Sequence, residues 1–151
     1  LMEPGRNVVA STRLYGGTVQ QFTNTIRKFG WSARFVDTED LDAVRAAIDG
    51  DTRAIFCESI ANPGGYITDL PVLARIAEGA GVPLIVDNTS ATPYLCRPIE
   101  FGATLVVHST TKYLTGNGTV TGGAVVDSGK FDWSAGGKFP SLAAPEPAYH
   151  G

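Results

Sequence analysis

The chain has 151 residues, of which 43% are hydrophobic and 18% are charged. Twelve basic and fifteen acidic residues give a formal net charge of −3, so we expect neither disorder nor a nucleic-acid partner held by phosphate contacts. No apolar run approaches the ~18 residues of a membrane span, so no membrane partner is expected. Cys57 and Cys96 lie far apart without a CxxC motif, which argues against a disulfide scaffold or a metal site and favours a reducing cytoplasm.

β-Rich runs alternate with helical patterns along the chain, which predicts an α/β fold with a mostly parallel sheet and helices on both faces. Six strands are expected, at Asn7–Ser11, Ala33–Val36, Arg53–Cys57, Pro83–Val86, Thr104–His108 and Gly122–Val126. We expect the last strand to be antiparallel, because no helix precedes it. After Asp127 the chain becomes rich in glycine and proline, and we expect it to run over the surface or an interface.

Three helices are expected between the strands. In the first, apolar side chains recur on one face up to a capping glycine: Val19, Phe22, Ile26, Phe29 and then Gly30. The second is expected to start from an N-cap at Thr38, and the third from an N-cap at Asp69 with Pro71 in its first turn. Their predicted buried residues are Leu41, Val44 and Ile48 in the second helix and Leu70, Leu73, Ala74 and Ala77 in the third.

The residues that directly follow the strands are the candidates for function, since ligands of open α/β sheets bind beyond the carboxyl ends of the strands. Four such segments are expected on one edge: residues 11–15, 59–62, 87–89 and 109–112. They bring together an aromatic ring at Tyr15, an amide at Asn62, a carboxylate at Asp87 and hydroxyls beside Lys112. These groups suit a phosphorylated, cationic heteroaromatic ring that bonds to a lysine, and pyridoxal phosphate is such a molecule.

Each of these residues also has an ordinary structural interpretation. Asp87 could be an N-cap or turn residue, Lys112 a solvated surface lysine, and Tyr15 a packing residue. Ser109 and Thr111 could satisfy local backbone groups. We expect His108 to be a hydrogen-bonded strand residue and the two cysteines to have no redox role. The coincidence of all the candidates on one edge favours function.

Five sequence blocks in order resemble the Cys/Met-metabolism family of pyridoxal-phosphate enzymes. They are Leu14-Tyr15-Gly16-Gly17-Thr18, Glu58-Ser59-x-Ala61-Asn62-Pro63, Val86-Asp87-Asn88-Thr89, Thr92-Pro93-Tyr94 with Arg97-Pro98, and the run from Gly102 through His108-Ser109-x-Thr111-Lys112-Tyr113. Within the family, the chain most resembles the O-acetylhomoserine sulfhydrylases, on Tyr15-Gly16-Gly17-Thr18 and on the tail Gly137-Lys138-Phe139-Pro140 through Pro147-x-Tyr149-His150-Gly151. The methionine γ-lyases tend to carry cysteine where Gly17 stands.

The resemblance implies the large domain of fold type I, which is like that of aspartate aminotransferase. It implies that Lys112 forms a Schiff base with the cofactor and that Asp87 holds the ring nitrogen. Ser109 and Thr111 would hold phosphate oxygens, and Tyr15 would stack on the ring, with a role in proton transfer left open. Asn62 would lie near the phenolic oxygen of the ring or the substrate carboxylate.

The resemblance also implies parts that are not in the 151 residues: an upstream glycine loop, a tyrosine and an arginine from a neighbouring subunit, and a C-terminal arginine for the substrate carboxylate. We therefore expect an interior piece of a longer protein, with an incomplete cofactor domain at residues 1–126 and an irregular segment at 127–151. The full protein is expected to be a homo-oligomer, a tetramer built from dimers.

The implied reaction is γ-replacement, in which O-acetyl-L-homoserine and sulfide give L-homocysteine and acetate. A cystathionine γ-synthase or a γ-lyase is the alternative enzyme, and a catalytically silent assembly module is the alternative without catalysis. A nucleotide-binding domain that uses Gly116 and Gly118 has little support, because an isolated pair of glycines is a weak motif.

Overall fold

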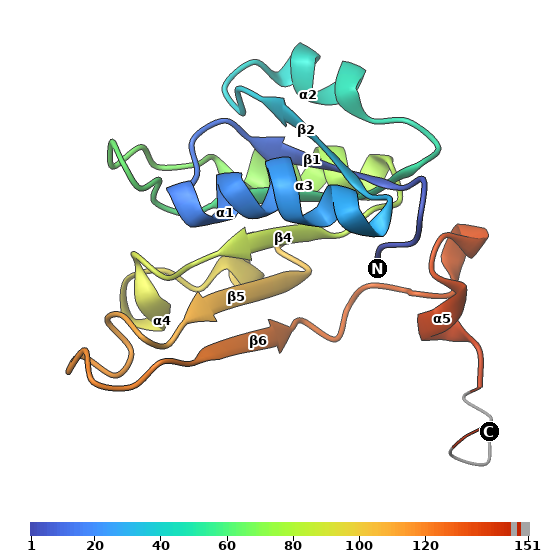
Figure 1. The fold of residues 1–151 in the computed structure, drawn as a ribbon. Coiled ribbons are helices and arrows are strands. Elements are labelled where there is room, and N and C mark those ends of the chain that lie inside the picture. The colour runs from blue at the N-terminus through green and yellow to red at the C-terminus, as the bar shows by residue number, and fades with distance from the viewer. Residues whose placement is uncertain (146–147, 149–151) are drawn as a thin grey trace.

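Six strands form one mixed sheet in the computed structural model, which describes residues 1–145 and 148 (Figure 1). They are β1 (Asn7–Ser11), β2 (Ser32–Val36), β3 (Thr52–Glu58), β4 (Leu84–Asp87), β5 (Leu105–Ser109) and β6 (Gly123–Asp127). Their order in the sheet is β2-β1-β3-β4-β5-β6, and every pair is parallel except β5 with β6. Each predicted strand is thus found within a residue or two, and the antiparallel direction of the last one is confirmed. The arrows of β4 and β5 in Figure 1 accordingly point left, and that of β6 points right.

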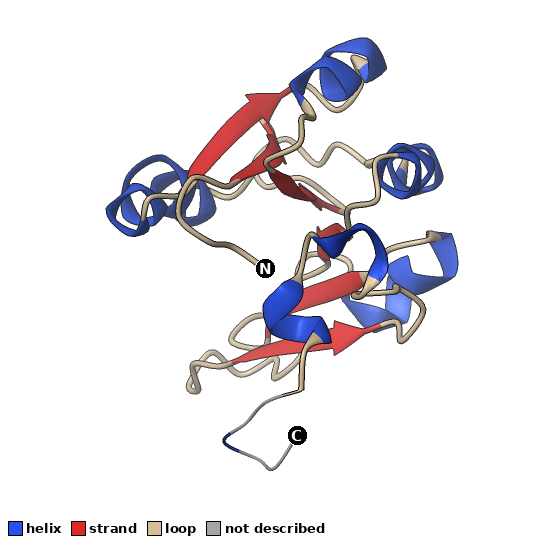
Figure 2. Cartoon of the chain, turned by 90° about the vertical axis from the view of Figure 1, so that its right-hand side faces the viewer, coloured by secondary structure: helices blue, strands red, loops and turns tan. Residues whose placement is uncertain are grey.

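Helices cover both faces of the sheet, as Figure 2 shows from its edge. One long helical segment comprises α1 (Gly16–Gln20), a π-helical turn (Gln21–Thr25) and a 3-10 turn (Ile26–Phe29). The other elements are α2 (Leu41–Ala47), α3 (Leu70–Gly79), α4 (Thr92–Leu95), α5 (Pro140–Ala143) and 3-10 turns at Pro98–Phe101 and Ala135–Gly137.

Side chains alternate between the two faces of each strand, and this alternation divides the core into two layers. Val9, Ile55 and Val86 face α2 and α3, where they pack with Val44 and Leu73. On the other face Val8, Ala10, Ala54 and Phe56 pack with Val19 and Phe22 of the first helical segment, and Ile85 and Val107 extend this layer. This second face is the one that carries the candidate site.

The helix ends follow the predictions with two exceptions. Gly30 ends the first segment with φ 75°, and the carboxylate of Asp69 accepts from the Val72 N–H, so both caps are confirmed. The predicted N-cap at Thr38 is wrong, because α2 begins only at Leu41 and the Asp40 carboxylate accepts from the Ala43 N–H. Phe29 is also not in the core: its side chain lies on the last, 3-10 turn and is 57% exposed.

The segment after β6 packs back on the body of the fold. Phe139 is buried in a cluster with Phe131 and Trp133, and the neighbouring Lys138 Nζ donates to the Ala80 carbonyl at the end of α3 at 2.9 Å. The predicted division of the chain at residue 126 stays a prediction. The last part of the tail motif, residues 147 and 149–151, lies outside the described residues.

Candidate active site

All six site residues predicted from the sequence line a single cavity of about 790 Å³. They are Tyr15, Asn62, Asp87, Ser109, Thr111 and Lys112. The cavity lies at the carboxyl ends of β3, β4 and β5, where the loops after those strands meet the start of α1. The expected gathering of the post-strand segments on one edge is therefore confirmed, although the chemical role of each residue stays a prediction.

Strand register places two carboxylates side by side in this cavity. Glu58 is the last residue of β3 and pairs with Asp87, the last residue of β4. Both belong to the face of the sheet on which Phe56 and Ile85 pack, because side chains two residues apart share a face. The cavity therefore contains a pair of neighbouring acids, of which the sequence predicted a role only for Asp87.

The Glu58 carboxylate connects two loops of the site. It is 5% exposed, and its oxygens accept from the Tyr15 N–H at 2.6 Å and the Asn62 N–H at 2.8 Å. Burial raises the pKa of Glu58; the two N–H donors lower it, and the nearby negative charge of Asp87 raises it further. Glu58 thus fixes the backbone of two predicted cofactor-binding residues.

The Asp87 carboxylate is held at one of its oxygens. Oδ1 accepts from the Thr89 backbone N–H at 2.9 Å and from the Thr89 hydroxyl at 2.5 Å. The same hydroxyl oxygen accepts from the Ser109 N–H at 2.8 Å. Oδ2 of Asp87 accepts no hydrogen bond among the residues that the structure describes, and it is the oxygen left for a ligand.

Lys112 and Thr111 lie in the turn that follows β5. The Lys112 N–H donates to the Ser109 carbonyl at 3.3 Å, and the side chain of Lys112 is exposed. The Thr111 hydroxyl donates to the Gly122 carbonyl at 3.2 Å and accepts from the Gly122 N–H at 3.0 Å. Both residues border the cavity, but Thr111 must exchange its bond to the Gly122 carbonyl before its hydroxyl can donate to a phosphate.

The ring of Tyr15 lies over Gly17, at the start of α1. It is 52% exposed, and a Cβ atom at position 17 would lie 2.6 Å from its Cε1 atom. A side chain at position 17 is incompatible with this ring position, so Gly17 determines how Tyr15 lies beside the cavity.

The sequence reasoning missed several residues of the site. Glu58, Ser90, Gly64 and Gly65 line the cavity. Thr89 lies in the predicted segment 87–89, but its role in joining Asp87 to Ser109 was not predicted. The period of two along β3 and β4 is the signal that could have identified Glu58, since its side chain shares a face with that of Asp87.

The expectation for His108 is only partly met. His108 lies in strand β5 as predicted and is buried there, but its Nδ1 has no hydrogen-bond partner among the described residues. The cause is its position on the apolar face that it shares with Val106. Cys57 and Cys96 are both free thiols, and burial raises the pKa of Cys57 to about 12. The expectation that neither has a redox role stays a prediction.

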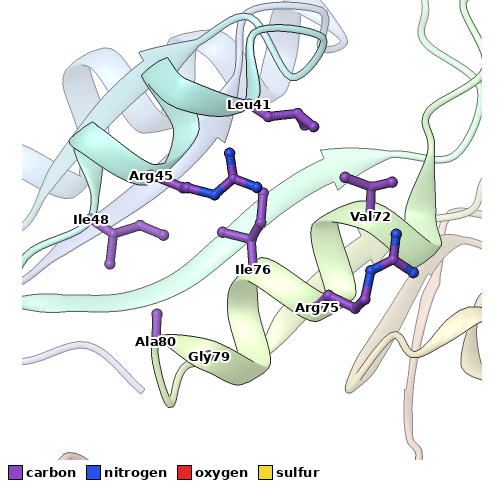
Figure 3. A pocket seen from close by; sticks show the side chains of 8 residues that line it. All are labelled: Leu41, Arg45, Ile48, Val72, Arg75, Ile76, Gly79 and Ala80. Atoms are coloured by element: carbon purple, nitrogen blue, oxygen red, sulfur yellow. The ribbon is translucent and has the colours of Figure 1, made fainter.

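The hollow between α2 and α3 offers less chemistry than the main cavity. Figure 3 shows a hollow between α2 and α3 that is lined by apolar side chains with Arg45 and Arg75, and it has no carboxylate, hydroxyl or amine. Among the described residues there is no cluster of acids, histidines and cysteines that could hold a metal, and no helix is long and apolar enough to cross a membrane. Gly116 and Gly118 border the main cavity in a loop that leads to β6 rather than to a helix, unlike a dinucleotide-binding turn.

Comparison with known proteins identifies the family. A family model described as Cys/Met metabolism PLP-dependent enzyme matches residues 1–144. The chain belongs to this family. A sulfhydrylase from Fusarium oxysporum is 47% identical over the whole chain, and a homocysteine synthase from Schizosaccharomyces pombe is 46% identical. The chain spans about a third of the length of these relatives, 35% and 36% respectively.

Solved structures of similar proteins have the same fold. A putative O-acetylhomoserine (thiol)-lyase from Campylobacter jejuni, solved with a pyridoxyl-lysine phosphate group, superimposes with a TM-score of 0.94 at 38% identity. It matches all of this chain and 38% of its own. An O-acetylhomoserine sulfhydrylase from Wolinella succinogenes gives 0.85 at 39% identity, with 99% of this chain and 41% of its own covered. The predicted fold type I domain is confirmed.

The residues present in the cavity fit pyridoxal phosphate, the cofactor on which this family depends. Asp87 has one carboxylate oxygen that accepts no hydrogen bond from the described part of the chain, as a protonated ring nitrogen requires. The end of β5 and the turn after it carry the hydroxyls of Ser109 and Thr111 and the amine of Lys112. One short segment can therefore supply both phosphate donors and the amine that bonds to the cofactor. The cavity volume of about 790 Å³ lies within the usual range of cofactor sites.

Proposed function

We propose that the full-length protein is an O-acetyl-L-homoserine sulfhydrylase, which converts O-acetyl-L-homoserine and sulfide to L-homocysteine and acetate. The gathering of Lys112, Asp87, Tyr15 and the hydroxyls of Ser109 and Thr111 on one cavity is the observation that carries the proposal. The names of the relatives, which are sulfhydrylases and homocysteine synthases at 46–47% identity, favour sulfide as the attacking group.

Pyridoxal phosphate, when bound, supplies an electron sink next to the α-carbon of the amino-acid substrate. Asp87 contributes a negative charge that keeps a proton on the ring nitrogen and so strengthens this sink. Ser109 and Thr111 contribute donors for the phosphate. Each of these roles uses residues that line the cavity, with Thr111 exchanging its bond to the Gly122 carbonyl.

Lys112 is proposed to carry protons as well as to bind the cofactor. Its amine would accept the proton from the α-carbon of the substrate and would return or remove protons at the neighbouring carbons, as a general acid and base. Tyr15 would cover one face of the ring, and its hydroxyl is a second candidate for proton transfer. Asn62 would donate to the phenolic oxygen of the ring or to the substrate carboxylate.

We also propose a homo-oligomer, a tetramer built from dimers, that works in the cytoplasm on small-molecule substrates. Tyr15, Asn62 and Lys112 are all exposed in this chain, so the cavity is open on one side and needs further protein to exclude water. Two free thiols agree with a reducing compartment.

The test is turnover by the full-length protein of O-acetyl-L-homoserine with sulfide, with homocysteine and acetate measured as products. Lys112→Ala should abolish turnover, while Lys130→Ala, which changes an exposed lysine away from the cavity, should leave it unchanged. Borohydride reduction should place a pyridoxyl mass on the peptide that contains Lys112.

Other products would identify the alternatives. Cystathionine formed from cysteine, with little reaction of sulfide, would indicate a cystathionine γ-synthase. A 2-oxo acid formed without any thiol would indicate a γ-lyase. A protein that binds no pyridoxal phosphate and turns over none of these substrates would refute the proposal and support a silent assembly module.

A further inference from the structure

Thr89 joins two residues that are proposed to bind opposite parts of the cofactor. Its hydroxyl donates to Asp87 Oδ1 at 2.5 Å and accepts from the Ser109 N–H at 2.8 Å. Its backbone N–H donates to the same Asp87 oxygen at 2.9 Å. A single side chain therefore contacts the acid for the ring nitrogen and the backbone of a residue proposed to hold the phosphate.

The register of the sheet explains this arrangement. Asp87 pairs with Val107 in the parallel ladder of β4 and β5. Two positions further along, Thr89 in the turn after β4 comes opposite Ser109, the last residue of β5. Thr89 is thus placed across from the Ser109 N–H by the same pairing that places Asp87 at the edge of the cavity.

Both donors of Thr89 reach one oxygen of the Asp87 carboxylate. Rotation of the carboxylate about its Cβ–Cγ bond would break two hydrogen bonds to a charged group, and such bonds are the stronger ones in proteins. The Ser109 N–H also polarises the Thr89 hydroxyl, which makes it a better donor. The arrangement reserves Oδ2 for a ligand, because Oδ1 is already occupied.

We infer that Thr89 is a positioning residue that holds Asp87 by Oδ1 and keeps Oδ2 as the acceptor for the protonated ring nitrogen of pyridoxal phosphate. The inference rests on the proposed function, since it assigns Asp87 to that nitrogen. It adds that the strength of the Asp87 contact with the ring depends on the Thr89 hydroxyl.

The test compares two cofactor probes that differ only at the ring nitrogen. Pyridoxal phosphate and its carbocyclic analogue, with a C–H group in place of that nitrogen, are titrated into the full-length Lys112→Ala protein, so that binding is non-covalent. Dissociation constants are read from the change in protein fluorescence. The added variants are Thr89→Val, Thr89→Ala and Thr89→Ser, with Thr119→Val as the matched control, because Thr119 is exposed and bonds only to Asn117 among the described residues.

Thr89→Val and Thr89→Ala should weaken the binding of pyridoxal phosphate by about tenfold to a hundredfold, because a misplaced Asp87 loses its hydrogen bond to the ring nitrogen and a bond to a charged group is worth that much. They should weaken the carbocyclic analogue by less than about threefold, because that probe makes no bond to Asp87. Thr89→Ser keeps the hydroxyl, so it and the control should bind both probes like the parent protein. Unchanged binding of the analogue also shows that a variant is folded, and a folded Thr89→Val or a folded Thr89→Ala is enough for the test.

Two results would overturn the inference but leave the proposed function standing. One is unchanged binding of pyridoxal phosphate by Thr89→Val and Thr89→Ala. The other is an equal loss of affinity for both probes, which would show a purely structural role of Thr89. Failure of the full-length protein with Lys112 intact to bind pyridoxal phosphate would instead refute the proposed function, and the inference would fall with it. A titration of the protein with Lys112 intact therefore separates the two failures.

Discussion

Removal of the Glu58 carboxylate should release the backbone at Tyr15 and at Asn62 together. In Glu58→Ala both N–H groups lose an acceptor, at 2.6 Å and 2.8 Å in the present structure. A hydrogen bond to a charged group contributes about 1.5–3 kcal/mol, and water entering from the adjacent cavity should recover part of the loss. We expect a local destabilisation of about 2–4 kcal/mol in total.

Amide hydrogen exchange measures this loss directly and without any assumption of two-state unfolding. A local destabilisation of this size corresponds to an opening equilibrium about thirtyfold to several hundredfold larger. Peptides of the full-length protein that contain the Tyr15 and Asn62 amides should exchange faster by that factor in Glu58→Ala. Glu58→Gln keeps one acceptor oxygen, so its effect should be intermediate.

The matched control is Glu78→Ala, which removes an exposed carboxylate near the end of α3 and should leave both peptides unchanged. Faster exchange in Glu58→Ala at only one of the two amides would mean that the Glu58 carboxylate does not connect the two loops. Exchange identical to that of the parent protein at both amides would refute the reasoning, since the two N–H groups would then have no need of Glu58.

Three further predictions concern the same region and its supports. The pKa of Glu58 is raised in the folded state, so the folded protein holds this proton more tightly than the unfolded chain, and stability falls as pH rises from about 4.3 to the raised pKa. The urea midpoint of the parent protein, measured relative to that of Glu58→Gln, should therefore decline over that pH window and then level off. An increase of this difference with pH would contradict the shift. Gly17→Ala should displace the Tyr15 ring and weaken pyridoxal phosphate binding severalfold. The control Gly16→Ala should not weaken it, because a Cβ atom at position 16 meets no atom within 4 Å. Equal binding by both variants would show that the position of the Tyr15 ring does not matter for cofactor binding. Asp69→Ala removes the N-cap of α3 and should cost about 1 kcal/mol in urea denaturation, whereas Asp69→Asn should recover most of it.

The strands, and the edge of the sheet that carries the site, were predictable because the strands share a regular sequence pattern. The run Leu84–Asp87 is apolar up to a terminal acid, and the neighbouring strands are largely apolar runs that end in the polar residues Glu58 and Ser109, so the positions just after strands could be identified without coordinates. A parallel sheet then brings those positions to one edge, which is why Tyr15, Asn62 and Asp87 were found together with Lys112.

The details that the sequence did not reveal depend on competition between similar residues. Thr38 and Asp40 are both good N-caps, and only the entry of the chain into α2 decides for Asp40. The first helical segment passes from α-helical through π-helical to 3-10 geometry, so the period of 3.6 fails at its end and Phe29 turns to solvent. In the sequence, Glu58 is simply a polar residue at the end of a strand. The residues around it do not indicate that the Tyr15 and Asn62 N–H groups of two loops will donate to its carboxylate.

The two neighbouring acids of the cavity are distinguished by what their oxygens already bind. Glu58 uses its carboxylate on two backbone N–H groups, and its pKa is raised by burial, so it is a poor partner for a further cation. Asp87 has both of its protein hydrogen bonds on Oδ1, and among the described residues nothing donates to Oδ2. Of the pair, only Asp87 can therefore offer a free carboxylate oxygen to a ring nitrogen without dismantling the loops around it. Glu58→Gln should accordingly leave the preference for pyridoxal phosphate over its carbocyclic analogue intact, whereas Asp87→Asn should abolish that preference.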